Sequence, residues 1–434
     1  MKRSMLQTCI LGICVLQGLP GFTAIGFAEQ LITVSKTSPA NCGSITDAVA
    51  DAAALLQDMA NRQLPEDDVI IRVLDNGHYY ESVSITDIPT SATATLTLES
   101  AAPGGTTIHT TGDQPAVRPM SIIRTNFVTI RGFTFQKDTP NAASGIIALV
   151  KFDGVAPPDS QVTFDYCIWD GRGLVYDNGT VLHCRYSHCN LTVTNSTIQG
   201  VVVGPVNASL VYLGPRTLPM ASTPTFTFCN NHVIDNTDAM VQLEGNSGAG
   251  LYHNIIIQDN AFFDNVGQYD LLFIRNQRAA NDISNNRFFG NGLSGISGDI
   301  FSGMTLALIN SGSALVAGNT FIQNGAMAEV FVQESSSGTT ELTGNTIAAS
   351  PASHFGVWAA LSGKAALRSY GNTFYSNYST KDPWNTLRTD YVAAWGTGKV
   401  KLTLDKWNDK TPKDGSDSLA GLGVQPPTPP SPTP

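Results

Sequence analysis

Four charged residues lie in or beside short aliphatic segments of the sequence and could take part in catalysis. They are Lys151, Asp177, Glu244 and Arg275. A glycoside hydrolase needs two carboxylates roughly 5–10 Å apart, and Asp177 and Glu244 fall two units apart in the repeat described below. A polysaccharide lyase instead needs a base, such as Lys151 or Arg275, beside groups that neutralise a uronate. We favour a surface salt bridge between Glu244 and Arg275, so no catalytic residue is assigned.

Aromatic residues occupy the centre of several of the same aliphatic segments. Alternation along a strand would point the flanking aliphatic side chains inward and the central side chain outward. The resulting external column comprises Tyr176, Tyr212, Phe273, Phe331 and Trp358. Exposed aromatic rings in a row indicate a binding surface, and the apolar C–H faces of sugar rings stack on such rings. The pattern therefore predicts a site for a linear polysaccharide, unless loops fold over these side chains and bury them.

The sequence predicts no metal ion and no other cofactor. Calcium is not supported, because the sequence lacks the dense Asp cluster expected of a calcium-assisted lyase groove. His183-Cys184 and His188-Cys189 combine metal-ligand residue types, but their spacing matches no standard zinc site. Five Cys lie beyond the N-terminal leader, namely Cys42, Cys167, Cys184, Cys189 and Cys229. Export would permit disulfides, whose pairing stays open and leaves one thiol over.

A repeat must position these residues. Its unit is an aliphatic residue, then often Asn, then an aromatic or aliphatic residue, as in Ile257, Asn260 and Phe262. The last position recurs at intervals of 26 to 35 residues from Phe135 to Phe374. A near-constant period indicates a solenoid whose loops vary in length. The units are rich in Val, Ile, Phe and Thr and alternate apolar with polar residues, which favours strands over helices.

The strand-rich repeat resembles the pectin-lyase-like superfamily of right-handed parallel β-helices over about residues 70–405. The segment Asn76-Gly-His-Tyr-Tyr-Glu81 is similar to the first coil of secreted β-helix enzymes, including pectin methylesterases. The resemblance implies an all-β solenoid of roughly ten coils that acts on polysaccharides. The sequence departs from the family in lacking the paired-Asp motifs of polygalacturonases and the esterase motifs beyond the first coil, which puts catalysis in doubt.

The Asn of each unit has a structural explanation. Two strands of one coil meet at a sharp bend that needs a residue at positive φ, a conformation that Asn tolerates. Coils stack about every 4.8 Å, so Asn side chains at one place in the coil can hydrogen-bond up the stack. The predicted internal ladder comprises Asn231, Asn260, Asn286, Asn319, Asn345 and Asn372.

The two ends of the chain do not carry the repeat. Residues 1–28 have a basic start, an apolar stretch and small residues before Glu29, as is typical of a secretory signal peptide. The Pro-rich residues 424–434 cannot build a core and are expected to form an extended, disordered tail.

The segment between the leader and the repeat is predicted to close one end of the solenoid. Open β-helix ends expose strand edges, which invite aggregation unless they are covered. Within residues 29–66, an N-cap box at Ser44 precedes apolar residues at helical spacing, so about residues 45–62 should form a capping α-helix. Residues 67–423 then make up the β-helix domain.

Composition narrows the partners of the protein. Only 14% of the residues are charged and the net charge is −10, so a basic face for nucleic acid is not expected. No segment beyond the leader is apolar for long enough to span a bilayer.

We therefore predict a monomeric β-helix protein, secreted or held at the cell surface or cell wall, that binds an extracellular polysaccharide or cell-wall component. Whether it also degrades this polysaccharide, as a lyase or a glycoside hydrolase, is left open. The alternative is a non-catalytic adhesive or structural surface protein.

Overall fold

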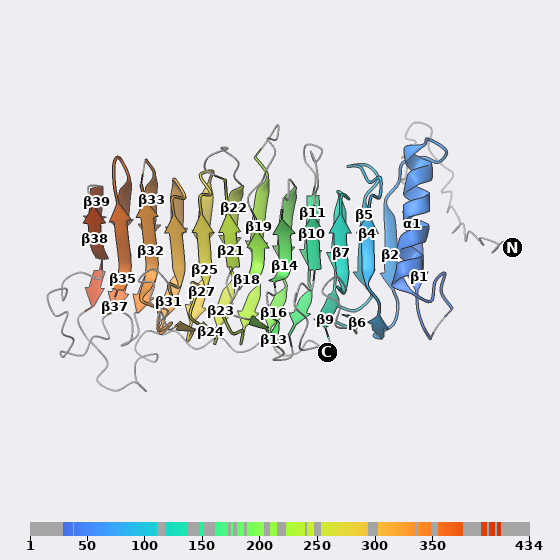
Figure 1. Cartoon of the computed structure of the whole chain (residues 1–434), viewed down its shortest axis with the longest axis horizontal. Coiled ribbons are helices and arrows are strands. Elements are labelled where there is room, and N and C mark those ends of the chain that lie inside the picture. The colour runs from blue at the N-terminus through green and yellow to red at the C-terminus, as the bar shows by residue number, and fades with distance from the viewer. Residues whose placement is uncertain are drawn as a thin grey trace, which may run out of the picture.

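The computed structural model is a parallel β-helix, a rod of stacked coils in which the chain passes repeatedly through three long parallel sheets (Figure 1). The structure describes residues 29–37, 39–110, 118–137, 148–151, 161–171, 175–176, 180–185, 189–203, 209–214, 223–238, 241–246, 253–293, 303–335, 337–348, 355–375, 392–396, 399–403 and 406–408. The predicted fold class, an all-β parallel solenoid with one helix at its N-terminal end, is confirmed for these residues.

The three sheets contain 13, 12 and 11 strands within the described residues. The 13-stranded sheet comprises β1 (Gln30–Val34), β2 (Val69–Val73), β5 (Leu96–Ser100), β8 (Val128–Arg131), β11 (Gln161–Asp165), β15 (Asn190–Thr194), β19 (Thr225–Cys229), β22 (Asn254–Gln258), β26 (Asn281–Ser284), β30 (Ala314–Ala317), β33 (Thr339–Thr343), β36 (Ala366–Tyr370) and β39 (Lys399–Thr403). The 12-stranded sheet comprises β3 (His78–Tyr80), β6 (Thr106–Thr110), β9 (Phe133–Lys137), β12 (Ile168–Asp170), β16 (Thr197–Gln199), β20 (His232–Ile234), β23 (Ala261–Phe263), β27 (Arg287–Phe289), β31 (Thr320–Ile322), β34 (Thr346–Ala348), β37 (Thr373–Tyr375) and β40 (Lys406–Asn408). The 11-stranded sheet comprises β4 (Val83–Thr86), β7 (Met120–Ile123), β10 (Ala148–Lys151), β14 (Thr180–Arg185), β18 (Ser209–Leu213), β21 (Val241–Glu244), β25 (Leu272–Arg275), β29 (Leu306–Ile309), β32 (Ala328–Glu334), β35 (Phe355–Leu361) and β38 (Val392–Gly396). Two short pairs lie outside them, β13 (Val175–Tyr176) with β17 (Val202–Val203) and β24 (Val266–Gly267) with β28 (Gly292–Leu293).

Alternation of side chains decides which residues fill the rod. In β19 the rings of Phe226 and Phe228 are fully buried, whereas Thr225 and Thr227 lie on the half-exposed outer face. Successive coils pair in register, so that each inward residue stacks on an inward residue of the next coil. Apolar positions of the three sheets thereby form one continuous core along the rod, which removes their side chains from water and is the main stabilising term of the fold.

Aromatic stacking strengthens the middle of this core. The ring centroids of Phe262 and Phe288 are 4.7 Å apart, and those of Phe288 and Phe321 are 4.8 Å apart, with interplanar angles of 13° and 5°. All three rings are fully buried. Such pairs contribute about 0.5–1.5 kcal/mol beyond the area that they bury, so this stack holds neighbouring coils in one register.

The six asparagines of the repeat form a hydrogen-bonded ladder inside the bend between the 13-stranded and 12-stranded sheets. Nδ2 of Asn231 donates to Oδ1 of Asn260 at 3.1 Å, and Nδ2 of Asn260 donates to Oδ1 of Asn286 at 2.9 Å. The same contact continues through Asn319, Asn345 and Asn372. Each side chain is buried and also donates to a main-chain carbonyl of a neighbouring coil, as Asn260 does to Phe228 at 2.7 Å. Buried polar groups need hydrogen-bond partners, and here the protein itself supplies the partners of the amide groups.

The residue at positive φ in this bend is not the ladder asparagine, and here the prediction was wrong. The preceding residue takes the left-handed conformation instead, with φ of 55° at Asn230, 56° at Asp259 and 58° at Asn285. In later coils glycine takes this place, with φ of 64° at Gly318 and at Gly344. Two neighbouring residues therefore have different roles in the bend. The first supplies the left-handed backbone conformation, and the second supplies the buried hydrogen bonds.

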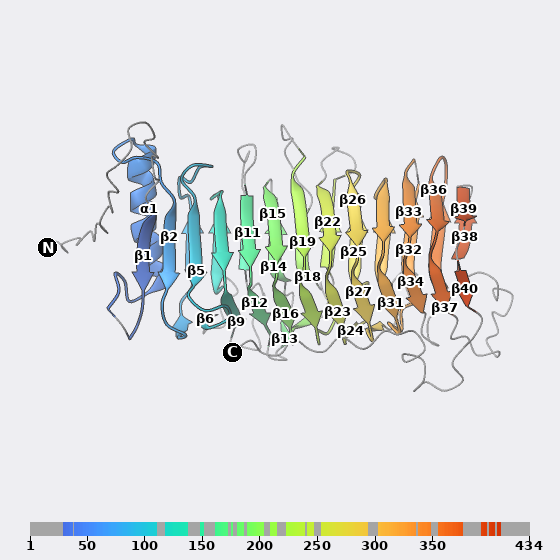
Figure 2. The ribbon, with the colours of Figure 1, turned by 180° about the vertical axis from the view of Figure 1, so that it is seen from behind.

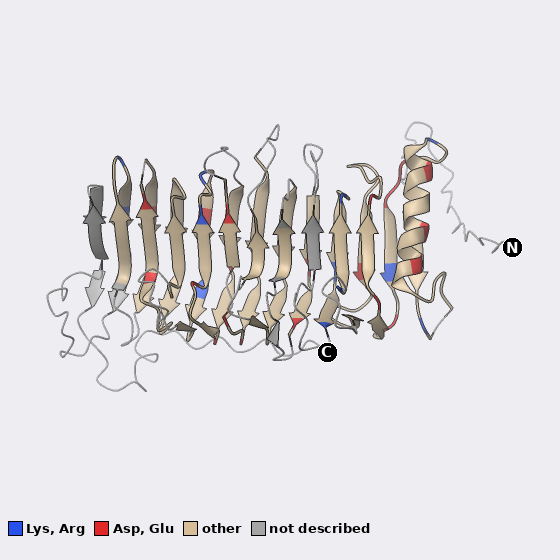
Figure 3. Cartoon of the chain, viewed as in Figure 1, with Lys and Arg blue, Asp and Glu red and all other residues tan. Residues whose placement is uncertain are grey.

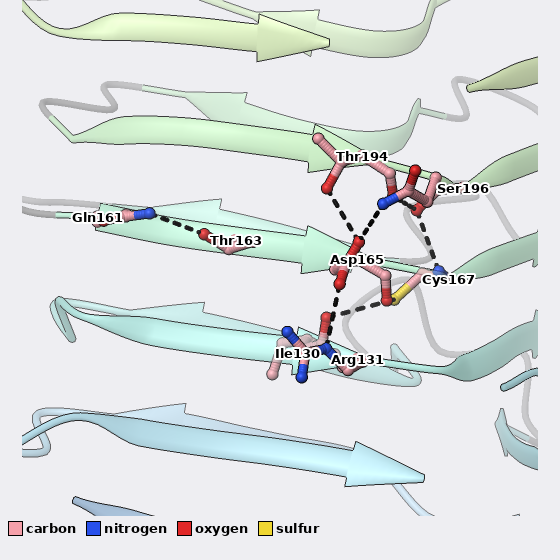
Figure 4. Close-up of polar contacts among 9 residues, drawn as sticks. Ile130, Arg131, Gln161, Thr163, Asp165, Cys167, Thr194 and Ser196 are labelled. Atoms are coloured by element: carbon pink, nitrogen blue, oxygen red, sulfur yellow. Dashed lines mark hydrogen bonds and ion pairs between the residues drawn. The ribbon is translucent and has the colours of Figure 1, made fainter. Parts of the chain in front are cut away.

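The ladder extends toward the N-terminus through a hydroxyl and a main-chain amide (Figure 4). The main-chain N–H of Ser196 donates to Oδ1 of Asn231 at 2.9 Å. The main-chain N–H of Cys167 donates to Oγ of Ser196 at 3.0 Å, as Figure 4 shows. Just outside the bend, Asp165 accepts hydrogen bonds from Thr194 and Asn195 of the next coil. Polar contacts between coils therefore begin before the first asparagine of the ladder.

A second asparagine ladder follows the bend between the 12-stranded and 11-stranded sheets. Nδ2 of Asn236 donates to Asn265 at 2.9 Å, and the contact repeats from Asn265 to Asn291 at 2.9 Å and from Asn291 to Asn324 at 2.7 Å. This ladder ends on a carboxylate, because Nδ2 of Asn324 donates to Oε2 of Glu329 at 2.8 Å. Glu329 is fully buried at the start of β32.

The helix α1 (Ile45–Ala60) lies at the N-terminal end of the rod (Figures 1 and 2), as predicted. Its N-cap is Ser44, whose side chain accepts from the N–H of Asp47 at 3.1 Å. The carboxylate of Glu81 accepts further N–H groups of the first turn, from Ile45 at 3.2 Å and Thr46 at 2.8 Å. The buried face of the helix joins the main core and contacts β1, β2 and β4, so α1 covers this end of the stack.

Charge is sparse along the described coils (Figure 3). On the 13-stranded sheet, opposite charges pair between coils at several places, as between Arg72 and Glu99 at 2.6 Å and between Arg131 and Asp165 at 3.1 Å. Like charges at one position of neighbouring coils would repel, so this arrangement agrees with the low charge content of the sequence. The expected signal peptide, residues 1–28, and the expected tail, residues 424–434, lie outside the described residues.

Candidate functional site

The outer face of the 11-stranded sheet carries polar and aromatic side chains at one register position on four consecutive strands. The position holds His183 on β14, Tyr212 on β18, Gln242 on β21 and Phe273 on β25. All four side chains are half-buried. The residues on either side of each one in its strand are buried and belong to the main core. Because adjacent strands lie about 4.8 Å apart, these side chains form a regular row along the rod.

Two ring contacts order this row. The rings of His183 and Tyr212 meet edge to face, with centroids 5.1 Å apart and an interplanar angle of 86°. On the other side, the guanidinium carbon of Arg275 lies 5.6 Å from the ring centroid of Phe273. This separation is within the range of a cation–π interaction. Both aromatic rings are therefore held by a polar neighbour and still reach the surface.

A chain of hydrogen bonds links the polar side chains beside these rings. Oγ of Ser209 donates to Oε1 of Gln242 at 2.5 Å, and Nε2 of Gln242 donates to Oε1 of Glu244 at 3.0 Å. Nη2 of Arg275 reaches the same oxygen of Glu244 at 2.6 Å, with side-chain exposures of 46% for Arg275 and 14% for Glu244. We refer to the surface made by His183, Tyr212, Gln242, Glu244, Phe273 and Arg275 as the His183–Arg275 face.

The predicted aromatic column is wrong at its C-terminal end. Phe331 on β32 and Trp358 on β35 do continue the register of Phe273 through Ala307, but they are 0% and 7% exposed. The two rings lie 5.0 Å apart and pack with Met304, Ala307 and Ala328 in a second, smaller hydrophobic cluster. Both faces of β32 are thus buried for most of its length, so these two rings are not a surface for sugars.

The predicted column is also wrong at Tyr176. This residue lies on β13, which pairs with β17 in a separate two-stranded sheet. The chain of this coil makes an additional short strand before it enters the 11-stranded sheet through β14, which places His183 where Tyr176 was expected. The hydrophobic pattern around Val175 is that of a strand, but the pattern does not say to which sheet the strand belongs.

Of the four charged candidates, only Glu244 and Arg275 have side chains in the described part of the structure. Glu244 and Arg275 are register partners on β21 and β25, and they form the salt bridge between adjacent coils that is described above. Lys151 ends β10 in the same sheet, opposite Arg185 of β14, and its side chain is outside the described part. Asp177 lies outside the described residues altogether. The surface salt bridge favoured from the sequence is therefore the arrangement found.

Three residues of this region were not predicted from the sequence as part of a site. His183 was considered only with its neighbouring cysteine as a metal-ligand type. Gln242 has the spacing of an outward central residue of a strand but is not aromatic, and Ser209 has no distinctive spacing. The alternation of β14 contained the missing signal, because Leu182 and Cys184 are buried and therefore point His183 to the outer face. Cys184 itself belongs to the core, where burial raises the pKa of its thiol well above the ordinary value.

Within the described residues, no group of three or more His, Cys, Asp or Glu side chains has the arrangement of a metal site. None of the five Cys beyond the leader forms a disulfide in the structure. In the same part of the chain, no helix has the length and apolar character needed to cross a membrane.

Comparison with known proteins gives likenesses of fold only. No protein-family model matches the sequence, and no curated protein matches it. The structure is similar to the A-module of the mannuronan C-5 epimerase AlgE4 from Azotobacter vinelandii, with 12% identity, a TM-score of 0.41, and coverage of 85% of this chain and 95% of that one. It is also similar to an alginate lyase from Paenibacillus sp. str. FPU-7, with 13% identity, a TM-score of 0.30, and coverage of 82% and 97%. A mannuronic acid-specific polysaccharide family 6 lyase from human gut microbiota has 11% identity, a TM-score of 0.33, and coverage of 91% and 89%. No residue role is transferred at these identities, and the β-helix is assigned from the strand order of this chain.

Proposed function

We propose that this protein is secreted and binds an extended polysaccharide along the His183–Arg275 face. The observation that carries the proposal is the row in which Tyr212 and Phe273 share one register position with Gln242 between them. Two half-exposed rings then lie two coils apart, or about 10 Å along the rod. This spacing suits two sugar rings of one linear chain, each stacked on an aromatic side chain through its apolar face.

The polar groups between the rings suit the hydroxyl groups of the same ligand. Both polar atoms of Gln242 have a protein partner, but each can form a further hydrogen bond, and the contacts of Glu244 with Gln242 and Arg275 both fall on Oε1. Sugar hydroxyls both donate and accept. Arg275 is nearly half exposed and offers N–H donors to a hydroxyl or an acidic substituent. Sites of this kind combine a few fixed polar groups with apolar surface, which supports binding of a glycan rather than of a purely apolar ligand.

Binding is favoured over cleavage by the state of Glu244. Its carboxylate is shared by Arg275 and Gln242, so it is held as an ion-pair partner, whereas a glycoside hydrolase needs an acid and a second carboxylate facing one bond. Two assays would test for catalysis directly. A hydrolase would release reducing ends from the polysaccharide, and a lyase would form unsaturated products that absorb ultraviolet light. Formation of either product would make the protein an enzyme.

Titration calorimetry against a panel of neutral and acidic linear polysaccharides tests the proposal. We expect saturable binding to at least one of them, and a loss of about tenfold or more when Tyr212→Ala and Phe273→Ala are combined, because each stacked ring contributes on the order of 1 kcal/mol. Tyr370→Ala is the matched control, since Tyr370 is 39% exposed on the 13-stranded sheet. Unchanged affinity in the double variant, or no binding to any member of the panel, would overturn the proposal.

The alternative of a non-catalytic adhesive or structural surface protein has its own support on the 13-stranded sheet. Its outer face carries threonine at one register position on five consecutive strands, a regular surface with few charges. These residues are Thr97, Thr129, Thr163, Thr192 and Thr227. Adhesion to intact cell walls that persists in the Tyr212→Ala/Phe273→Ala variant, and is lost when Thr163 and Thr192 become Lys, would favour this alternative.

A further inference from the structure

Two histidine rings face each other on the first two strands of the 12-stranded sheet, near the N-terminal end of the rod. His78 begins β3, and His109 lies in β6, the adjacent strand. Nδ1 of His78 and Nε2 of His109 are 2.5 Å apart, and the ring centroids are 4.8 Å apart. The register places His109 opposite Tyr80, so the two rings meet diagonally across the strands. We call His78 and His109 the histidine pair.

The histidine pair is fixed on one side and open to solvent on the other. His109 is only 2% exposed, and the ring of Tyr80 stacks on it with a centroid distance of 5.0 Å and an interplanar angle of 17°. His78 is exposed, and its carbonyl oxygen accepts from Nζ of Lys36 at 2.6 Å. A small ligand can therefore reach the facing nitrogens from the side of His78. The buried ring of His109 is held in place in advance, as a binding site requires.

The two facing nitrogens are potential metal ligands. A neutral imidazole carries a hydrogen on one ring nitrogen and a lone pair on the other, so a direct hydrogen bond between the rings uses one of each. When both hydrogens move to the outer nitrogens, the two lone pairs converge on one point. Imidazole lone pairs are ligands that Zn²⁺, Cu²⁺ and Ni²⁺ prefer, and a cation between the rings removes the repulsion between the lone pairs.

A metal ion between the rings requires only a small movement. Zn²⁺–N bonds are about 2.0–2.1 Å long, so two nitrogens on one ion lie roughly 2.9–3.4 Å apart. The facing nitrogens must therefore separate by about 0.4–0.9 Å, which the exposed ring of His78 can provide. Charge at this place does not exclude a cation. The carboxylate of Asp75 accepts from the main-chain N–H of Lys36 at 2.7 Å and so offsets the ammonium group of the same residue.

We propose that the histidine pair binds a divalent cation of the late first-row transition metals through Nδ1 of His78 and Nε2 of His109. Within the described residues no third His, Cys, Asp or Glu completes the site, so water supplies the other ligands. Affinity should be highest for Cu²⁺ and lower for Ni²⁺ and Zn²⁺. Mg²⁺ should not bind, because it prefers oxygen ligands. This inference does not rest on the polysaccharide proposal, because neither residue belongs to the His183–Arg275 face.

Calorimetric titration with the chlorides of Cu²⁺, Ni²⁺, Zn²⁺ and Mg²⁺ tests the site. The protein is purified without a polyhistidine tag and titrated at about pH 7.5, where histidine is mostly neutral. We expect saturable binding of the first three ions. His78→Gln should weaken it by about tenfold or more, since even loss of a group that only orients a metal ligand costs about 10–100-fold. The matched control is His232→Gln, because His232 is half-buried on the same sheet between Thr197 and Ala261, and it should leave binding unchanged.

Two further measurements identify the ligands. The electron paramagnetic resonance spectrum of the Cu²⁺ complex should show coupling to two imidazole nitrogens, and to fewer in His78→Gln. Acidification to about pH 5 should weaken binding by about tenfold or more, because protonated imidazole has no lone pair for the metal. His109→Gln should show the same loss as His78→Gln, and the exposed position of His78 keeps the test valid if the buried variant does not fold. Equal affinity in the wild type and His78→Gln, or binding of none of the three ions, would overturn the proposal.

Discussion

Replacing Glu329 by glutamine should stabilise the protein at neutral pH and remove part of its pH dependence. The carboxyl group is fully buried. Its Oε2 accepts from Oγ1 of Thr305 at 2.7 Å and from Nδ2 of Asn324 at 2.8 Å, whereas Oε1 is buried without a hydrogen-bond partner. Burial outweighs these hydrogen bonds and raises the pKa of Glu329 from 4.5 to about 7.

The sign and size of the effect follow from this shift. The folded state holds the proton of Glu329 up to about pH 7, whereas the unfolded chain releases it near pH 4.5. Folding is therefore favoured at acidic pH, and this contribution is lost as the pH rises from 4.5 through 7. The shift amounts to about 3 kcal/mol at 1.36 kcal/mol for each unit of pKa. Glutamine is neutral at every pH, and its side-chain oxygen can still accept from Asn324.

Urea unfolding of the wild type and of Glu329→Gln between pH 4.5 and 8 measures this difference. The free energy of unfolding of the variant, relative to that of the wild type, should rise by about 3 kcal/mol across this range. The control is Glu341→Gln, because Glu341 lies at the surface, 3.3 Å from Arg368, and should change stability by less than about 1 kcal/mol. Parallel pH profiles for the wild type and Glu329→Gln would show that folding does not raise the pKa of Glu329.

Three further predictions concern the bends and the core. Asn286→Ala removes the hydrogen bonds from Asn286 to Asn319 and Ile257 and the oxygen that accepts from Asn260. Thermal unfolding should therefore show a free energy of unfolding that is lower by about 2–4 kcal/mol. A smaller decrease than that caused by Thr227→Ala, at an outward position, would show that the ladder does not stabilise the fold. At Gly344, where φ is 64°, Gly344→Asn should cost less stability than Gly344→Val, because a β-branched residue disfavours positive φ; equal costs in chemical denaturation would count against the division of tasks in the bend. The buried thiol of Cys184, whose pKa is raised by burial and by Cys189, should react with iodoacetamide only after unfolding; rapid alkylation of the native protein would show that this part of the core is open.

The fold was predictable from the sequence because the residue types that recur in the repeat are those whose side chains face the interior of the rod. Every coil needs an apolar inward position and a buried hydrogen-bonding group at the bend, so Phe288 and Asn286 recur at a near-constant period. The neighbour at positive φ was misassigned, since Asn230, Asn285 and Gly318 all suit the left-handed backbone and the sequence shows Asn at both places.

The outer face was less predictable, because strand periodicity says only which side of the sheet a residue faces. Phe331 and Trp358 have the expected register, yet what packs over the sheet at their coils is set by tertiary structure. Tyr176 lies in a segment with a strand pattern, but the choice between a long sheet and a two-stranded pair depends on the path of the whole coil.

Hydroxyl-radical footprinting of the protein with and without bound polysaccharide would show directly whether the ligand covers the His183–Arg275 face. The rings of Tyr212 and Phe273 are half-exposed and react readily with the radical, so their modification can be read by mass spectrometry in the same sample as that of Tyr370. We expect the polysaccharide to protect Tyr212 and Phe273 and to leave Tyr370 unchanged. Protection of Tyr370 with none at Tyr212 and Phe273 would place the ligand on the 13-stranded sheet and would rule out binding along the His183–Arg275 face.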